Sequence, residues 1–298
     1  MNTGKNKNAP TRRSIMGAAT AAAAAALLKT TPTAHAADDQ GPAASKGNIN
    51  HSVCLWCYDK MKSSDMAPHA QRLGLKAIDL LKPNEFAPLK EHGLICSMTS
   101  GVEGGITSGF NRKENHEKIN DSLRKLCDAN AANGYPNVIC FSGNRNGMDD
   151  AEGMKNCAEG IKKVVGYFEE KKVNLQMELL NSKVNHKDYM CDRSPLGIEL
   201  VKMVGSERFV LLYDIYHMQI DEGDVIATIQ KNHQYFGHYH TGGVPGRHEI
   251  DDTQELNYPA IMKAIVKTGF KGYVAQEFIP KNKDMIASLA QAVKICDV

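Results

Sequence analysis

The chain has 298 residues, with 36 Lys and Arg against 34 Asp and Glu, so its formal net charge is +2. Five of the bases and none of the acids fall within residues 1–36. The remainder therefore carries 31 bases against 34 acids, a net charge near −3. A slightly acidic body without a basic stripe argues against nucleic acid as a partner.

Residues 1–36 predict a twin-arginine-type export signal. Arg12 and Arg13 precede an alanine-rich apolar stretch over 15–28, and Ala34-His35-Ala36 matches a small-x-small cleavage site. The paired arginines indicate twin-arginine export and hence a periplasmic location. The apolar stretch is too short for a stable membrane span. A disordered basic tail is the alternative interpretation.

Residues 37–47, rich in Ala, Asp, Gly and Pro, predict a flexible arm. From 48 to 298, short apolar runs alternate with amphipathic stretches, which predicts one α/β domain. The expected strands are 49–56, 75–80, 94–98, 137–141, 174–179, 209–214, 235–240 and 272–277. The expected helices are 116–130, 151–171, 196–204, 225–231, 259–267 and 286–295. Eight strands in a chain of this length favour a single (β/α)8 TIM barrel over a doubly wound open sheet.

All eight cysteines lie beyond the predicted export signal. Cys54 and Cys57 have the spacing of a redox or zinc pair, but they lie in an apolar run expected to be a strand. Residues three apart in a strand point to opposite faces, so buried thiols are the favoured interpretation. Disulfide pairing stays open.

Four metal-binding side chains stand where apolar runs end: Glu178, Asp214, His240 and Glu277. The gaps between them are 36, 26 and 37 residues, each about one strand–helix–strand unit. A parallel barrel brings the carboxyl ends of its strands to one mouth, so we expect the four to converge there. Three carboxylates and an imidazole suit one divalent metal ion such as Mg²⁺, Mn²⁺, Co²⁺ or Zn²⁺.

Such an ion could polarise the carbonyl of a hydroxy-ketone and acidify the adjacent C–H. Glu178 and Glu277 would then be the catalytic residues that remove and return the proton through an enediolate. His217 follows a strand end near the predicted metal. The turn over 244–249 would place Arg247 and Glu249 over the mouth, and Trp56 could stack on a sugar face. These four are the substrate-binding candidates.

Two further features border the predicted mouth. His238 shares a strand face with His240 and is a candidate outer partner of that ligand. The glycine-rich segment 101–109 is either a lid or a mobile turn.

Three segments resemble the hydroxypyruvate isomerases of the xylose-isomerase-like superfamily. They are 212–219 (LYDIYHMQ), 244–249 (VPGRHE) and 274–278 (VAQEF). The resemblance spans 37–298 and is strongest from residue 177 onward. It implies a TIM barrel, a divalent metal and aldose–ketose isomerisation between two glutamates. It also implies metal-ligand positions at Glu178, Asp214, His240 and Glu277, and substrate contacts at His217 and Arg247.

The sequence departs from that family at two places. Hydroxypyruvate isomerases usually have glutamine where His240 stands, whereas sugar epimerases of the superfamily have histidine. The family's Glu-Pro-Ile-Asn segment reads Glu178-Leu-Leu-Asn181 here. These differences and the export signal make an exported sugar epimerase or keto-glycoside lyase the alternative to a hydroxypyruvate-isomerase-like enzyme.

Two other functions are alternatives to a metal-dependent isomerase. One is a non-catalytic barrel that binds sugars. An abasic-site endonuclease is disfavoured, because it would need more metal ligands and a basic face. The expected partner is a small hydroxy-carbonyl compound or sugar, and self-association into a homo-oligomer stays open.

Overall fold

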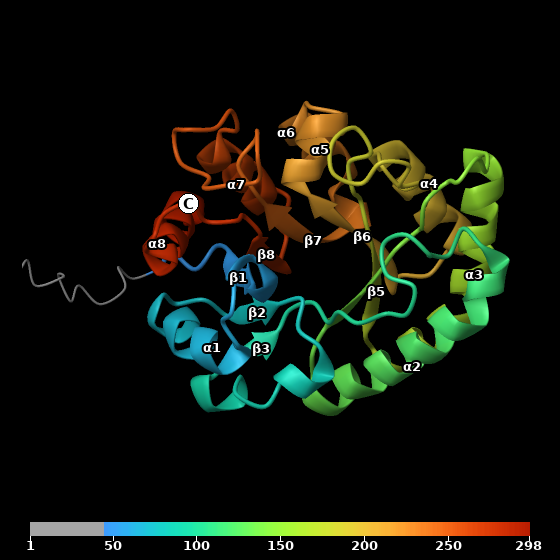
Figure 1. The fold of residues 1–298 in the computed structure, drawn as a ribbon, viewed down its shortest axis with the longest axis horizontal. Coiled ribbons are helices and arrows are strands. Elements are labelled where there is room, and N and C mark those ends of the chain that lie inside the picture. The colour runs from blue at the N-terminus through green and yellow to red at the C-terminus, as the bar shows by residue number, and fades with distance from the viewer. Residues whose placement is uncertain (1–44) are drawn as a thin grey trace, which may run out of the picture. The chain divides into compact units, whose positions relative to one another are not determined.

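The computed structural model describes residues 45–298, in which eight parallel strands alternate with helices (Figure 1). The strands are β1 Asn50–Cys54, β2 Ala77–Asp79, β3 Ile95–Cys96, β4 Asn137–Cys140, β5 Asn174–Glu178, β6 Phe209–Asp214, β7 Phe236–Thr241 and β8 Tyr273–Gln276. The α-helices are α1 Ser63–Arg72, α2 His116–Asn133, α3 Asp150–Lys171, α4 Ser194–Val204, α5 Ile215–Asp221, α6 Val225–Asn232, α7 Tyr258–Lys267 and α8 Met285–Cys296.

The predicted export signal, residues 1–36, lies outside the described residues, as does most of the predicted arm over 37–47. At the described end of that arm, the backbone N–H of Lys46 donates a 3.0 Å hydrogen bond to the carboxylate of Asp297. Among residues 45–298, no helix is long and apolar enough to cross a membrane.

The sheet closes on itself. Its strand order is β3-β2-β1-β8-β7-β6-β5-β4, with every pair parallel. Thr99, just after β3, makes the closing bridge to β4: its N–H donates to the Asn137 carbonyl at 2.9 Å, and its carbonyl accepts from Ile139 N–H at 3.0 Å. The predicted (β/α)8 barrel is confirmed, and the open sheet is excluded because the Thr99 bridge joins the two edge strands of the order, β3 and β4.

The first half of the barrel is the least regular, and here the sequence predictions fit least well. Strands β2 and β3 are shorter than expected. Two 3₁₀ turns, Pro83–Glu85 and Lys90–His92, replace a helix between them. Pro83 and Pro88 lie in this segment, and proline removes the N–H that a continuing helix needs. Helix α1 was not predicted, because Pro68 interrupts a mainly polar sequence.

The later helices follow the predicted periodicity, except α5, which directly follows β6 and was not predicted. Helices α2 and α4 end at Gly134 and Gly205, whose φ angles of 70° and 74° are in the left-handed region that glycine adopts most easily. Helix α3 begins after Asp149, whose carboxylate accepts the N–H groups of Ala151 and Glu152.

The barrel interior contrasts with the apolar layer between strands and helices. Several polar side chains are almost completely buried and point inward from different strands; they are Ser52, Asp79, Gln176, His238 and His240. Buried polar groups need partners, and their concentration inside the barrel marks the region that supports a site.

Candidate metal centre and active-site cavity

Four strand ends place the predicted metal ligands together. Glu178 ends β5, Asp214 ends β6, His240 lies near the end of β7, and Glu277 directly follows β8. Each contributes one nitrogen or oxygen atom to a group whose members lie within 4.8 Å of one another, and all four are buried. Pairing of Asp214 with His240 and of His240 with Ala275 sets this register. The predicted convergence of the four is therefore present in the structure.

His240 lies between the two glutamates. Its Nδ1 is 2.6 Å from Glu277 Oε2 and 3.4 Å from Glu178 Oε1. In the described chain this nitrogen has no partner with hydrogen-bond geometry, although it is buried. The two distances show that Nδ1 is directed into the carboxylate cluster.

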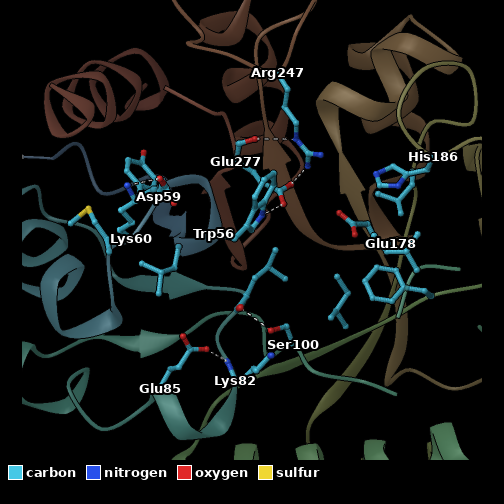
Figure 2. Close-up of a pocket in the computed structure, with 18 of the residues that line it drawn as sticks. Trp56, Asp59, Lys60, Lys82, Glu85, Ser100, Glu178, His186, Arg247 and Glu277 are labelled. Atoms are coloured by element: carbon cyan, nitrogen blue, oxygen red, sulfur yellow. Dashed lines mark hydrogen bonds and ion pairs between the residues drawn. The ribbon is translucent and has the colours of Figure 1, made fainter. Parts of the chain in front are cut away.

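Arg247 and Trp56 close one side of the cluster around Glu277 (Figure 2). Arg247 Nη2 lies 2.6 Å from Glu277 Oε2 and 3.2 Å from Asp214 Oδ2. Trp56 Nε1–H donates to Glu277 Oε1 at 2.8 Å, and the guanidinium lies over the indole, 5.2 Å from its centroid. Trp56 itself lies in the 3₁₀ turn Leu55–Cys57, because β1 ends at Cys54 rather than at the predicted residue 56.

In the metal-free cluster, the surroundings shift the pKa values of the three carboxylic acids in different directions. Burial raises the pKa of Glu178, and it raises the pKa of Asp214 further, with the charge of Glu277 adding to the effect. Burial also acts to raise the pKa of Glu277, but Arg247 and His240 outweigh it and hold that pKa well below its usual value. Burial lowers the pKa of His240, yet the carboxylate of Glu277 reverses this and raises it well above the usual value.

The donor set fits a divalent cation. Three buried carboxylates repel one another unless protons or cations compensate them, and Arg247 reaches only two of them. Nδ1 of His240 faces the same space and would supply a neutral ligand atom once a cation displaced its proton. Oxygen-rich sets with one imidazole suit Mg²⁺, Mn²⁺, Co²⁺ or Zn²⁺.

A cavity of about 770 Å³ opens beside the cluster. Of the four clustered side chains, Glu178 and Glu277 line it, whereas Asp214 and His240 do not. Figure 2 shows Lys82, Glu85 and Ser100 on the side of the cavity away from Arg247. Ile106, from the glycine-rich segment 101–109, also lines it.

The other predicted substrate contacts divide into two groups. Arg247 and Trp56 line the cavity. His217 is fully buried behind it: its Nδ1 accepts from the backbone N–H of Asn181 at 3.2 Å, and its Nε2 is 3.6 Å from Asp214 Oδ2. The structure places Glu249 outside the cavity lining, because its carboxylate accepts the backbone N–H groups of Lys281 and Asn282 and the hydroxyl of Ser288.

Two buried residues that the sequence did not reveal contact the cluster or the histidine beside it. Asp79, at the end of β2, lies 3.2 Å from Nε2 of His240. Asn181 fixes the ring of His217 through its side chain as well, at 2.6 Å from Nδ1. Asp79 could have been found from the sequence as a carboxylate near the end of a predicted strand. That strand is short and irregular and contains no distinctive motif, so the residue was not assigned.

The cysteines form no disulfide in the described chain, where all eight are buried and free. Burial raises the pKa of Cys54 well above its usual value, with the charge of His240 opposing the effect. A thiol in this environment stays protonated, which agrees with the predicted buried thiols.

The chain belongs to the xylose isomerase-like TIM barrel family, whose model matches residues 69–295. A 2-oxo-tetronate isomerase of Pectobacterium atrosepticum is 24% identical over 221 residues, covering 70% of this chain and 84% of that protein. A D-psicose 3-epimerase of Agrobacterium fabrum is 31% identical over 134 residues, covering 41% of this chain and 45% of that protein. The predicted family resemblance is thereby confirmed, and the comparisons identify an enzyme of the isomerase type.

Solved structures agree on the fold. The 3-keto-D-glucoside 4-epimerase of E. coli superposes with a TM-score of 0.70 at 14% identity, covering 83% of this chain and 100% of that chain. At identities this low the similarity establishes the barrel and not the substrate.

Proposed function

We propose that this protein is a divalent-metal-dependent isomerase of small hydroxy-carbonyl compounds that transfers a proton between Glu178 and Glu277. One observation carries the proposal: only these two members of the ligand cluster also line the cavity. They can therefore face the cation and a substrate carbon at the same time. Asp214 and His240 do not line the cavity, and they complete the ligand set on the side of the cluster away from it.

The chain supplies the acid–base groups and their placement. When bound, a divalent cation would polarise the carbonyl and stabilise the charge of an enediolate. One glutamate removes the proton from the hydroxyl-bearing carbon beside the carbonyl, and the other returns a proton to the former carbonyl carbon, while the hydroxyl proton passes to the former carbonyl oxygen. Burial raises the pKa of Glu178, so this residue is suited to hold a proton, whereas Arg247 and His240, against the effect of burial, keep Glu277 ionised.

Arg247 and Trp56 orient the substrate in this proposal. Their guanidinium and indole reach the cavity beside Glu277. His217, predicted as a substrate contact, is fully buried and does not line the cavity, so we assign it a supporting position beside Asp214. Glu249, predicted as a fourth contact, is assigned no substrate contact, since its carboxylate is used by backbone groups.

The size of the cavity favours a second candidate within the same chemistry, a sugar epimerase or keto-glycoside lyase. A cavity of about 770 Å³ is in the range that accommodates drug-sized ligands and exceeds the needs of a three-carbon acid. Trp56 is 49% exposed and offers an apolar face of the kind that stacks on sugar rings. Both candidates begin with proton abstraction beside a carbonyl.

The test is deuterium exchange from solvent into hydroxypyruvate, free ketoses and 3-keto-glucosides, followed by NMR with Mg²⁺, Mn²⁺, Co²⁺ or Zn²⁺ added. We expect exchange with wild type and its loss in Glu277→Gln. Glu249→Gln is the matched control, because it makes the same charge change in the same part of the chain outside the cavity, and it should retain exchange. Undiminished exchange in Glu277→Gln would rule out the acid–base role. A folded wild type that binds these sugars without exchanging protons would instead be a sugar-binding barrel.

We further propose periplasmic export directed by residues 1–36. The support is the sequence pattern alone, in which Arg12 and Arg13 precede the apolar stretch. Replacing both with lysine should retain the protein in the cytoplasm, as measured by cell fractionation. Unchanged periplasmic recovery would contradict the proposal.

A further inference from the structure

A second carboxylate layer lies below the ligand cluster, on the side away from the cavity. Asp79 at the end of β2 is fully buried and does not line the cavity. Its Oδ1 is hydrogen-bonded to His240 Nε2 at 3.2 Å. The opposite nitrogen of the same ring, Nδ1, faces Glu178 and Glu277. His240 thus connects the two layers.

The register of the barrel produces this contact. Asp79 pairs with Cys54 of β1. Its carboxylate contacts His238 and His240 of β7, so its side chain points into the barrel. His238 and His240 are two residues apart on β7, so both project to the same face of the sheet, into the interior. In the strand order, β1 and β8 lie between β2 and β7, so the Asp79–His240 contact crosses the interior.

Polar groups that can donate hydrogen bonds surround the buried carboxylate of Asp79. Ser97 Oγ donates to Oδ2 at 2.5 Å, and Ser52 Oγ lies 2.6 Å from Ser97 Oγ. His238 Nε2 lies 2.9 Å from Oδ2, and the Cys54 thiol lies 3.7 Å from Oδ1. Ser97 Oγ and His240 Nε2 thus lie within hydrogen-bond distance of different oxygens, and the carboxylate accepts at both positions.

An ionised carboxylate at Nε2 requires a proton on that nitrogen, which leaves Nδ1 as the ligand atom. We propose that Asp79 is the positioning residue of the metal site, holding His240 in the ring orientation and tautomer that direct Nδ1 at the cation. This inference rests on the proposed function, because it requires a divalent cation at Glu178, Asp214, His240 and Glu277.

The same residues could be read as a second cation site, since ligand atoms of Asp79, His238 and His240 also lie within 4.8 Å of one another. The positioning role is favoured because the hydrogen bonds already made, from Ser97 and His240, satisfy both carboxylate oxygens. A second cation at this position would also have to displace the proton on Nε2. Metal stoichiometry separates the two interpretations.

The test measures metal affinity and ring chemistry rather than turnover. Mn²⁺ affinity is determined by titration, and ¹H–¹⁵N correlation NMR of the Zn²⁺-loaded protein reports which nitrogen of His240 carries the proton. We expect one cation per chain, with Nδ1 bound and Nε2 protonated. Asp79→Asn should weaken Mn²⁺ binding 10- to 100-fold, the usual effect of losing an outer partner of a ligand.

Two controls separate positioning from a general loss of structure. Ser52→Ala removes a hydroxyl from the same buried layer without touching Asp79 and should change affinity less than about threefold. In a His240→Ala background, Asp79→Asn should have little further effect, because the residue through which it acts is absent.

The outcomes distinguish the proposals. If wild type binds no cation, the proposed function fails and the inference with it. If wild type binds one cation but Asp79→Asn binds equally well, or if His240 coordinates through Nε2, the inference alone fails. Two cations per chain would also overturn it.

Discussion

The indole N–H of Trp56 donates a 2.8 Å hydrogen bond to Oε1 of Glu277, while Arg247 holds Oε2 of the same carboxylate at 2.6 Å. Both oxygens of the proposed acid–base residue are thus oriented by neighbours. A donor on each oxygen fixes the rotamer and leaves the carboxylate facing the cavity.

Trp56→Phe separates this hydrogen bond from the aromatic surface. Phenylalanine keeps an apolar face but has no N–H, so we expect kcat to fall about 10-fold through a misplaced Glu277, with KM changed little. Trp56→Ala should in addition raise KM, because it removes the face as well. Steady-state kinetics on the substrate found by exchange screening provide the measurement. A Phe variant with unchanged kcat would mean that the hydrogen bond does not position Glu277.

Arg247→Met tests how the loss of the Arg247 guanidinium affects the stability of the carboxylate cluster. Methionine approximates the length of the side chain but removes the guanidinium that contacts both Asp214 and Glu277, so the buried carboxylates keep only His240 as a positive partner. We expect the metal-free variant to lose about 3 kcal/mol of unfolding free energy. Added Mn²⁺ should restore more thermal stability to the variant than to wild type, since it supplies the missing charge. Differential scanning calorimetry with and without EDTA measures both effects, and equal Mn²⁺-induced shifts would contradict the prediction.

Thr99→Val tests the closure of the barrel. The Thr99 hydroxyl donates to Asn130 Oδ1 at 2.6 Å, and Asn130 Nδ2 donates to the Asn137 carbonyl at 2.8 Å. Valine preserves the shape but leaves the buried Asn130 oxygen unpaired, which costs about 1–3 kcal/mol. Urea unfolding measures the loss. Ser100→Ala, whose hydroxyl binds the Leu80 carbonyl in a half-buried position, should cost less. A larger loss from Ser100→Ala would show that Thr99 is not the critical closure contact.

His51, near the start of β1, is expected to make the stability of the protein depend on pH. Burial lowers the pKa of His51 from 6.5 to about 4, with Asp297 opposing the shift. Between these values the unfolded chain binds a proton that the folded chain does not, so stability is complete above pH 6.5 and decreases as the pH falls toward 4. His51→Gln should flatten this part of the profile. Urea unfolding from pH 7 to pH 4.5 measures it, and parallel profiles for the two proteins would exclude His51 as the titrating group.

The sequence by itself determined the barrel and the four clustered side chains. The reason is local: strand and helix periodicities are visible over a few residues, and parallel strands necessarily end at one mouth. Glu178, Asp214, His240 and Glu277 each end or follow an apolar run, so their convergence followed from the count of strands. Regular elements in the second half, with glycine stops such as Gly134 and Gly205, made that count reliable.

Only the tertiary structure decided which atoms of these residues face each other and which neighbours orient them. Glu249 turned toward backbone groups of a later loop, and Asp79 met His240 across the interior, 161 residues away in sequence. Such pairings depend on strand register, on side-chain direction and on barrel closure at Thr99. None of these features produces a periodic pattern in the sequence. The direction of a buried polar side chain depends on where its hydrogen-bond partner lies, and distant strands supply that partner here.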